Sequence, residues 1–346
     1  MRAWVLREYG RPLELEDRPV PEISRPDELL LRIEGAGVCA TDLHAIDGEM
    51  EPAGLTLPIV LGHESAGRVA SAGDLVSTVA VGDPVLICPP HTCGLCVACR
   101  RGRDMMCAHH QFTGLTVDGG FAEYVVVSER SIVPIPAGLD PASVAPYSDA
   151  GITAYHAVKR LSHLIVPGST IVALGIGGVG HVGLQLLREL GSGGTIVAVD
   201  PSPRRRALAA SLGADAVLDA IEVPSAVRDL TEGRGADLVM DFVGTDDTHA
   251  AGLEMLTRGG TYSIVGFGGV VTMPSAAMVG NETTIVGNLV GSWIDLWEVL
   301  QLHARGRLTL KTETHPLEAV NDVLAQLREG EITGRAVLVP NGGEPT

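Results

Sequence analysis

Hydrophobic and polar residues follow a strand-like pattern in the first part of the chain. Short apolar runs, separated by glycine and proline, lie at residues 29–33, 66–70, 85–87 and 121–127. Runs of this length bounded by turn residues predict β-strands. Few long helical patterns occur before about residue 140. We therefore expect an irregular, β-barrel-like domain in this part.

From about residue 150 the pattern changes to alternating strands and helices. Near-continuous apolar runs predict buried strands, and apolar spacings of three and four residues predict helices between them. Strands are expected at 170–174, 195–199, 236–243 and 261–265, and helices at 177–190, at 204–212 and closing at 253–256. This alternation predicts an α/β domain with a doubly wound parallel sheet.

The end of the chain has a third pattern, with helices expected at 296–305 and 317–327 and a strand at 335–339. We expect this tail to return to the first domain. A chain of 346 residues suits two domains better than one core. The expected division is 1–149 with 290–346 for one domain, and 150–289 for the other.

Charge and composition narrow the classes of partner. The net charge of −17 repels phosphate backbones and anionic lipids, so we expect neither nucleic acid nor a membrane as partner. No apolar stretch reaches the roughly 18 residues of a membrane span, and the first apolar stretch ends at Arg7, too early for a signal peptide. A cytoplasmic protein is expected, and there six cysteines suggest metal ligands or catalysis before disulfides.

A glycine-rich turn follows the strand at 170–174 and opens the next helix. Its sequence is Gly175, Ile176, Gly177, Gly178, Val179 and Gly180. In this context Gly175 makes the tight turn, Gly177 leaves room for a pyrophosphate, and Gly180 lets the helix pack close to the sheet. The helix N-terminus then offers free N–H groups to the phosphates. The alternative is a plain strand-to-helix turn.

Asp200 ends the second strand of this unit, twenty residues after Gly180. An acid there accepts hydrogen bonds from the adenosine ribose hydroxyls and repels a 2′-phosphate, which favours NAD over NADP. Three arginines follow at residues 204–206. They could hold a 2′-phosphate, flank the ribose or face solvent.

Four cysteines lie within fifteen residues of one another: Cys93, Cys96, Cys99 and Cys107. Four thiolates at this spacing form a closed tetrahedral shell for a structural zinc ion, with no position left for substrate. We expect this zinc lobe at about residues 90–110. The alternative is a set of surface cysteines without metal. Cys88 stands apart and is expected to be a buried apolar thiol.

The motifs together resemble the zinc-containing alcohol dehydrogenases of the medium-chain dehydrogenase/reductase superfamily, especially bacterial secondary-alcohol dehydrogenases. The resemblance rests on the Cys39 segment, on Gly62, His63 and Glu64, on the four-cysteine lobe, and on the glycine turn with Asp200. It covers essentially the whole chain. It implies a GroES-like β-barrel catalytic domain and a Rossmann dinucleotide-binding domain.

The same resemblance implies a second, catalytic zinc ion, giving two zinc ions per chain. Its ligands would be Cys39, His63 and Asp149, where many members carry cysteine in place of the aspartate. Glu64 would lie behind the metal or act as a transient ligand. Asp42 would fix the tautomer of His63.

The resemblance also assigns a proton path and further cofactor contacts. Thr41 would accept the proton from the substrate oxygen and pass it through the ribose hydroxyls of the cofactor to His44 at the surface. The remaining implied NAD contacts are Thr153, Arg205, Val243, Val265, Asn288, Val290 and Arg335. Leu289, Val290 and Trp293 could line the substrate pocket or belong to the core.

The expected activity is the reversible NAD-linked oxidation of primary or secondary alcohols to aldehydes or ketones. A related zinc dehydrogenase acting on polyols or other substrates is the alternative within the enzyme class. A redox sensor or structural protein that binds zinc and a dinucleotide is the alternative outside it. The resemblance further implies a homodimer or homotetramer joined near residues 270–290.

Overall fold

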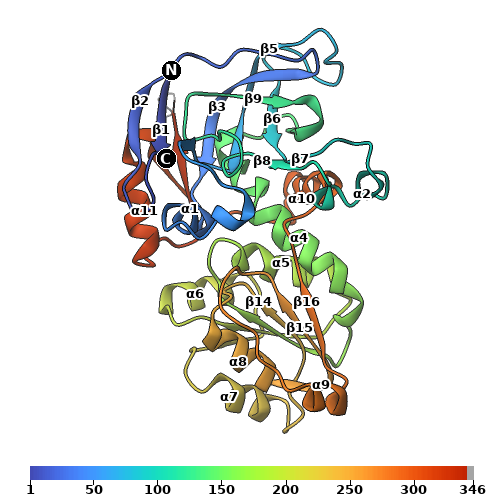
Figure 1. Cartoon of the computed structure of the whole chain (residues 1–346). Coiled ribbons are helices and arrows are strands. Elements are labelled where there is room, and N and C mark those ends of the chain that lie inside the picture. Colours follow the sequence, from blue (N-terminus) through green and yellow to red (C-terminus); the bar gives the residue numbers. More distant parts are fainter. Residues whose placement is uncertain (341–346) are drawn as a thin grey trace. The chain divides into compact units, whose positions relative to one another are not determined.

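The computed structural model describes residues 1–340 and separates into two compact units (Figure 1). Unit 1 consists of Met1–Ile152 and the chain from Gly291 onward, and unit 2 is Thr153–Val290. Within residues 1–340, no helix combines the length and hydrophobicity needed to cross a membrane.

Unit 1 is built mainly from antiparallel strands. A three-stranded sheet has the order β2 (Glu14–Asp17), β1 (Arg2–Leu6) and β4 (Ile59–Val60). A larger sheet has the order β10 (Ile132–Pro134), β6 (Pro84–Ile87), β5 (Glu64–Ala72), β3 (Glu28–Gly37), β18 (Arg335–Val339) and β17 (Thr312–Pro316), with β9 (Tyr124–Ser128) also on β3. A two-stranded sheet joins β7 (Pro90–His91) to β8 (Gln111–Phe112). Because side chains alternate along β3, its buried positions line one apolar core.

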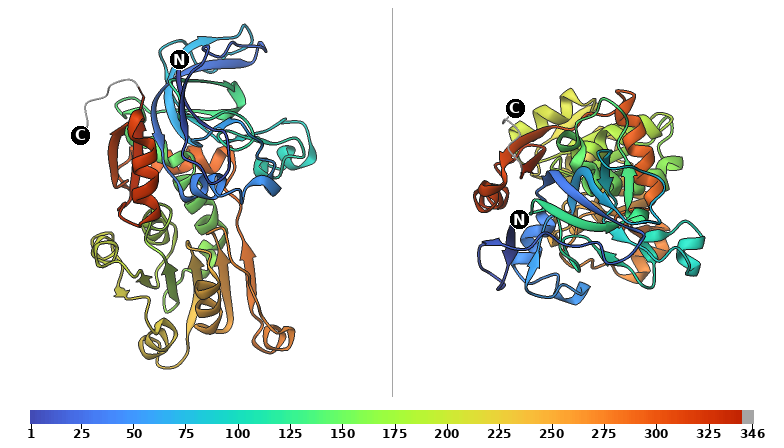
Figure 2. Two further views of the ribbon diagram at one scale, coloured as in Figure 1. Left: turned by 60° about the vertical axis from the view of Figure 1, so that its left-hand side comes forward. Right: turned by 90° about the horizontal axis from the view of Figure 1, so that it is seen from above.

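The C-terminal part of the chain belongs to the same unit as the N-terminal part. β18 pairs antiparallel with the end of β3, where Val337 lies opposite Gly37. Figure 2 shows this red segment beside the blue N-terminal strands. The helices of the unit are short apart from two near the C-terminus: α1 (Ala40–Ile46), α2 (Val97–Arg100), α3 (Pro141–Val144), α10 (Trp293–Ala304) and α11 (Val320–Arg328).

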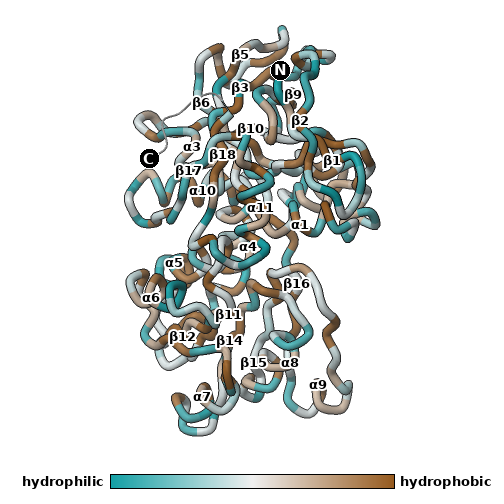
Figure 3. The backbone as a smooth tube through the Cα atoms, turned by 90° about the vertical axis from the view of Figure 1, so that its left-hand side faces the viewer, coloured by the Kyte–Doolittle hydropathy of each residue, from teal (hydrophilic) through white to brown (hydrophobic). Residues whose placement is uncertain are grey.

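Unit 2 is a six-stranded parallel sheet with helical connections. The strand order is β13 (Ala216–Leu218), β12 (Thr195–Val199), β11 (Thr170–Leu174), β14 (Ala236–Asp241), β15 (Leu256–Ile264) and β16 (Thr284–Gly287). Figure 3 shows apolar residues along β11 and β14 and a hydrophilic α6. The helices are α5 (Gly180–Leu190), α6 (Pro203–Ser211), α7 (Val223–Leu230), α8 (Asp246–Glu254) and α9 (Ser275–Asn281). A further helix, α4 (Ala150–Leu161), begins in unit 1 and continues into unit 2.

The predicted fold class is confirmed. The sequence did not predict β13, β16, α4, α7 or α9. Other differences lie at element boundaries. The helix expected to close at 253–256 ends at Glu254, because the Met255 carbonyl already accepts a sheet hydrogen bond from Ala236 N–H. The helix expected from 296 begins at Trp293, since Ser292 and Asp295 form a capping box. The helix expected at 317–327 is a 3-10 turn, Leu317–Ala319, followed by α11.

Candidate active site

Strand pairing in unit 1 brings Cys39 and His63 together. The end of β3 lies antiparallel to the start of β5, with Gly37 opposite Glu64. Cys39 follows β3 as the N-cap of α1, and His63 directly precedes β5. Both side chains are buried, Cys39 at 5% exposed and His63 at 1%. Two ligand-type atoms thus meet at one end of the sheet.

Asp149 reaches the same place from a third segment. It follows the 3-10 turn Ala145–Ser148, which is fixed on β5 because Ser148 Oγ donates to the Ser65 carbonyl at 3.2 Å. Asp149 Oδ2 lies 3.6 Å from Cys39 Sγ and 3.7 Å from His63 Nε2. A tetrahedral zinc shell of sulfur, nitrogen and oxygen has ligand–ligand edges of about 3.5 Å, so the three atoms fit such a shell.

Asp42 holds the His63 ring from the other side. One oxygen of Asp42 accepts the Cys39 N–H at 2.9 Å, and the other lies 3.3 Å from His63 Nδ1. This contact directs Nε2 towards Asp149. Burial lowers the pKa of His63, but the charge of Asp42 and side-chain interactions with Asp149, Asp42 and Cys39 outweigh burial and raise that pKa well above its usual value.

Glu64 and Arg335 form a fully buried ion pair at this cluster. Arg335 Nη2 lies 2.7 Å from Glu64 Oε1, which also accepts the N–H of Ala150 at 3.2 Å. Burial raises the pKa of Glu64 and Arg335 lowers it, with a net value of about 7. Gly37 is required here, because a Cβ on it would lie 2.1 Å from Glu64 Oε2.

The polar atoms of this cluster fit a cation. His63 Nε2 and Glu64 Oε2 are buried without a hydrogen-bond partner among the described residues. Buried polar atoms normally have such partners, so two unsatisfied atoms in one place call for a ligand. The ligand atoms of Cys39, His63, Glu64 and Asp149 all lie within 4.8 Å of one another. The donor set of sulfur, nitrogen and oxygen suits zinc.

The four cysteines of the predicted zinc lobe also converge. Cys96 Sγ lies 3.5 Å from Cys99 Sγ and 3.9 Å from Cys107 Sγ, and Cys107 Sγ lies 3.5 Å from Cys93 Sγ. Ligands about 2.3 Å from a tetrahedral zinc ion are separated by about 3.8 Å. The geometry therefore fits a closed four-thiolate shell.

The acidity of these thiols differs because their surroundings differ. Hydrogen bonds from the backbone of Cys99 and Ala108 lower the pKa of Cys96 to about 6. Burial and the neighbouring cysteines raise the pKa of Cys99 to about 12. Four adjacent thiolates repel one another, so a cation is needed to hold all of them deprotonated. Cys88 lies outside this group and is 3% exposed.

The glycine turn in unit 2 has the geometry of a phosphate-binding turn. It follows β11, and α5 begins at Gly180. Gly175 has a φ of 84°, a conformation that favours glycine. A Cβ on Gly180 would lie 1.8 Å from the Gly175 carbonyl oxygen, whereas a Cβ on Gly177 would meet nothing within 4 Å. The space at Gly177 is the space that a pyrophosphate needs. Gly178 and Val179 complete the turn and are half-buried.

Asp200 is held in place beside this turn. It is 2% exposed, and its two carboxylate oxygens accept the N–H groups of Ile176 and Ser202, each at 2.8 Å. Arg206 donates to the Asp200 carbonyl at 2.8 Å and lies 2.8 Å from Asp219. That arginine is therefore committed to neighbouring acceptors, and Asp200 is fixed where a ribose would meet it.

The other predicted cofactor residues of unit 2 lie mainly at the carboxyl ends of strands. Val243 follows β14, and Val265 follows β15. Asn288 follows β16, where its side-chain amide donates to Ser263 Oγ and to the Ile264 carbonyl, each at 2.9 Å. Val290 has a φ of 41°, which is strained for a β-branched residue.

Comparison with known proteins assigns the family. The model of the alcohol dehydrogenase GroES-like domain matches residues 25–137, and that of the zinc-binding dehydrogenase matches residues 178–305. An alcohol dehydrogenase from Rhizobium meliloti (strain 1021) is 36% identical over 344 residues and covers 99% of both chains. The chain belongs to the zinc-binding alcohol dehydrogenases. It is therefore an oxidoreductase.

Two further comparisons cover nearly the whole dehydrogenase. An NAD-dependent alcohol dehydrogenase from Sulfurisphaera tokodaii is 35% identical, over 98% of this chain and 100% of that protein. The crystal structure of the alcohol dehydrogenase from Aeropyrum pernix superimposes with a TM-score of 0.96 at 39% identity, covering 98% of this chain and 100% of that one. The similarity thus extends to both units.

The remaining predicted residues of the dehydrogenase occupy varied surroundings. Thr41 Oγ1 lies 3.7 Å from Cys39 Sγ, next to the cluster of possible metal ligands. His44 lies on α1, its side chain 29% exposed, with Nδ1 2.5 Å from a carboxylate oxygen of Glu49. Thr153 is buried on α4, and Arg205 is half-buried on α6.

Arg335 has contacts that the sequence did not predict. The family resemblance places it at the pyrophosphate, but in the structure it contacts the Glu64 carboxylate and, at 3.5 Å, the Val38 carbonyl. The sequence did contain a sign of this pairing. Arg335 begins a strand of otherwise apolar residues, and an arginine in such a strand requires a buried acid as partner. The pyrophosphate role stays a prediction.

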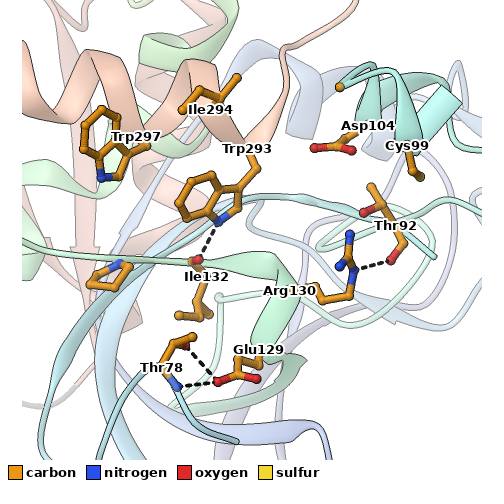
Figure 4. A pocket seen from close by; sticks show the side chains of 12 residues that line it. Thr78, Thr92, Cys99, Asp104, Glu129, Arg130, Ile132, Trp293, Ile294 and Trp297 are labelled. Carbon is orange, nitrogen blue, oxygen red and sulfur yellow. Dashed lines mark hydrogen bonds between the residues drawn. The ribbon is translucent and has the colours of Figure 1, made fainter. Parts of the chain in front are cut away.

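Trp293 lines a cavity of about 710 Å³ in unit 1 (Figure 4). Its indole N–H donates to the Ile132 carbonyl at 2.7 Å. The cavity also borders Cys99 of the zinc lobe and Trp297 of α10. None of its lining residues is a predicted ligand of the catalytic zinc. The possible role of Trp293 in the substrate pocket therefore gains no support from this cavity.

Proposed function

We propose that this dehydrogenase catalyses the reversible, NAD-linked oxidation of primary and secondary alcohols to aldehydes and ketones. The observation that carries the proposal is the convergence of Cys39, His63 and Asp149 on one buried point. Three protein ligands leave one position of a tetrahedral zinc ion for the substrate oxygen. A redox sensor or a structural protein would not need an open coordination position on its zinc ion.

In this proposal Cys39, His63 and Asp149 hold the catalytic zinc. The ion supplies a Lewis acid that stabilises negative charge on the alcohol oxygen. Asp42 keeps His63 in the tautomer that presents Nε2. Glu64 lies behind the ligands, near enough to serve as a transient ligand, and Arg335 balances its charge. Cys93, Cys96, Cys99 and Cys107 hold the structural zinc.

Thr41 and His44 carry the proton in this proposal. The Thr41 hydroxyl lies next to Cys39 and accepts the proton from the substrate oxygen. His44 lies on the same helix, is partly exposed, and transfers the proton to solvent. Its hydrogen bond with Glu49 supports this role, because a carboxylate stabilises the protonated imidazole.

Unit 2 binds NAD in this proposal. The turn at residues 175–180 receives the pyrophosphate at the N-terminus of α5, and Asp200 accepts both hydroxyls of the adenosine ribose. The fixed carboxylate of Asp200 supports NAD over NADP, because it repels a 2′-phosphate. Thr153, Val243, Val265, Asn288 and Val290 surround the nicotinamide end, and Arg205 flanks the ribose.

Two copies joined through unit 2 form the proposed oligomer, a homodimer or a homotetramer of two such dimers. β16 is an edge strand of the described sheet, and exposed Val270 and Val279 precede it along the chain. Unpaired strand edges are templates for pairing with a second chain.

A cytoplasmic location is also proposed, since all six cysteines, each within the described residues, are free of disulfides.

A substrate panel tests the proposed reaction. Zinc-loaded protein is mixed with NAD or NADP and with primary alcohols, secondary alcohols or polyols, and absorbance of the reduced cofactor is followed. Simple alcohols should reduce NAD with kcat/KM at least about tenfold above that with NADP. Reduction by polyols alone would favour the alternative enzyme class. No reduction with any alcohol would contradict the proposed function.

A further inference from the structure

Three buried polar side chains of unit 2 form a cluster to which the proposed function gives no role. Asp241 and Tyr262 are 0% exposed, and His249 is 2% exposed. The Tyr262 hydroxyl lies 2.6 Å from Asp241 Oδ2 and 2.7 Å from His249 Nδ1. His249 Nε2 lies 3.2 Å from the Gly268 carbonyl oxygen. The contacts form one chain of hydrogen bonds from Asp241 to Gly268.

This chain needs one proton more than its groups ordinarily carry. Its three hydrogen bonds require three hydrogens, of which the Tyr262 hydroxyl supplies one and a neutral imidazole supplies another. Burial, and then the hydrogen bond to Asp241, raise the pKa of Tyr262, so the phenol keeps its proton. The other acceptor near that hydroxyl, the Thr248 carbonyl, is 3.5 Å away and too distant to compete.

The additional proton is best placed on His249. Asp241 Oδ1 accepts the N–H groups of Val243 at 2.8 Å and Gly244 at 3.0 Å, and such hydrogen bonds favour the ionised carboxylate. An imidazolium at His249 then donates to Tyr262 and to the Gly268 carbonyl. Its charge is compensated by Asp241, whose Oδ2 lies 3.3 Å from His249 Nδ1.

The cluster fixes two loops at the carboxyl edge of the sheet. Besides the bonds to its side chain, the Asp241 carbonyl accepts the N–H groups of Val265 at 2.8 Å and Gly266 at 2.9 Å. The loops touch directly, since a Cβ on Gly266 would lie 2.3 Å from the Val243 carbonyl carbon. A Cβ on Gly175 would lie 2.4 Å from Val243 Cγ2, so the first loop also adjoins the glycine turn.

We propose that Asp241, Tyr262 and His249 are positioning residues for the dinucleotide. Ligands of doubly wound sheets bind at the carboxyl ends of the strands, and the two loops held by the cluster carry Val243 and Val265. The inference rests on the proposed binding of NAD by unit 2. None of the three side chains touches the cofactor in this proposal; they set the shape of the loops that do.

The Tyr262→Phe variant tests this role, because it removes the middle hydroxyl and keeps the ring. We expect the Kd and KM for NAD to rise about tenfold, as for the loss of a hydrogen bond to a charged group. We expect kcat with a saturating alcohol to change less than about twofold. Tyr147→Phe is the matched control, since Tyr147 is also 0% exposed and its hydroxyl lies 3.0 Å from His303 Nδ1 in unit 1. Its Kd for NAD should stay that of the wild type.

Calorimetric titration with NAD and nitrogen NMR of the wild-type histidines separate the outcomes. The His249 signal, assigned by its loss in His249→Gln, should show both ring nitrogens protonated at neutral pH. A singly protonated His249 ring in the wild-type protein would overturn the proton count. A Tyr262→Phe protein that is less stable but binds NAD like the wild type would overturn the positioning role. Wild-type protein that fails to bind NAD would instead overturn the proposed function.

Discussion

In the proposed zinc site, Asp149 would supply an oxygen where many members of the family, by the resemblance, carry a sulfur. Aspartate and thiolate each carry one negative charge, so the formal charge of the site is the same with either. Oxygen is the harder donor, so a zinc ion held by Cys39, His63 and Asp149 should be a stronger Lewis acid and easier to remove. An oxygen in place of a sulfur at this one ligand would therefore change both the Lewis acidity of the zinc ion and how tightly the site retains it.

Asp200 leads to a residue-level prediction about cofactor choice. Asp200→Gly removes the carboxylate that accepts the ribose hydroxyls and repels a 2′-phosphate. We expect the ratio of kcat/KM for NAD to that for NADP to fall at least about tenfold, about 1.4 kcal/mol. Steady-state kinetics with both cofactors measure the ratio.

Asp215→Asn is the control for Asp200→Gly. Asp215 also accepts a backbone N–H, that of Ile196 at 2.7 Å, but at the start of β12, away from the carboxyl edge of the sheet. The ratio of kcat/KM for NAD to that for NADP in Asp215→Asn should match that of the wild type. A ratio that stays fixed in Asp200→Gly would remove Asp200 from the selection of NAD.

The zinc lobe is an element with almost no core of its own. Its helices are α2 and the 3-10 turn Asp104–Met106, each of one turn. Its apolar side chains Leu95 and Val97 are 72% and 66% exposed. A segment with so little buried apolar surface cannot offset its chain entropy by packing. The four cysteines therefore act, with zinc, as the centre around which the lobe folds.

Cys96→Ser should release the structural zinc and leave the catalytic one. We expect zinc content to fall from about two to about one ion per chain, with faster proteolysis between residues 93 and 107. Cys88→Ala is the control, because Cys88 is buried outside the lobe and should leave both ions bound. Retention of two ions by Cys96→Ser would contradict the four-thiolate assignment.

The same lobe should lose its zinc in acid. The pKa of Cys96 is about 6, below its ordinary value of 9.0, because backbone N–H groups stabilise the thiolate. A lowered pKa contributes stability above the ordinary pKa, and this contribution is lost as pH falls through about 6. Bound zinc resists protonation of the thiolate, so zinc release measured against pH should occur only below about pH 6, and release at or above that value would contradict the assignment.

Elements with a strong local pattern were predictable, and elements fixed by distant pairing were not. β11, β12 and β14 are continuous apolar runs, and the sequence alone predicts them. β13 and β16 are short, and the sequence did not predict them. β2 and β17 are different, because their residues are mostly polar and partly exposed. Their pairing with β1 and β18 defines them as strands, and no periodicity within a short polar segment reveals such pairing.

At the scale of the whole molecule, the proposed metal ligands all lie in unit 1, and the glycine turn with Asp200 lies in unit 2. Motif spacing and the family resemblance identified these residues as candidates from the sequence alone. Contacts such as that of Cys39 with Asp149, 110 residues apart, required the fold. The Glu64–Arg335 pair and the Asp241 cluster were not predicted, because neither belongs to a local motif and each depends on strands meeting in three dimensions.

Asp149→Ala tests the central claim most directly, with zinc content and NAD-linked oxidation of a secondary alcohol measured on the same sample. We predict that zinc falls from about two ions per chain to about one, and that kcat/KM falls at least about a hundredfold. Asp149→Cys should restore the second ion and part of the activity. Asp149→Ala protein with both ions and wild-type activity would contradict the account.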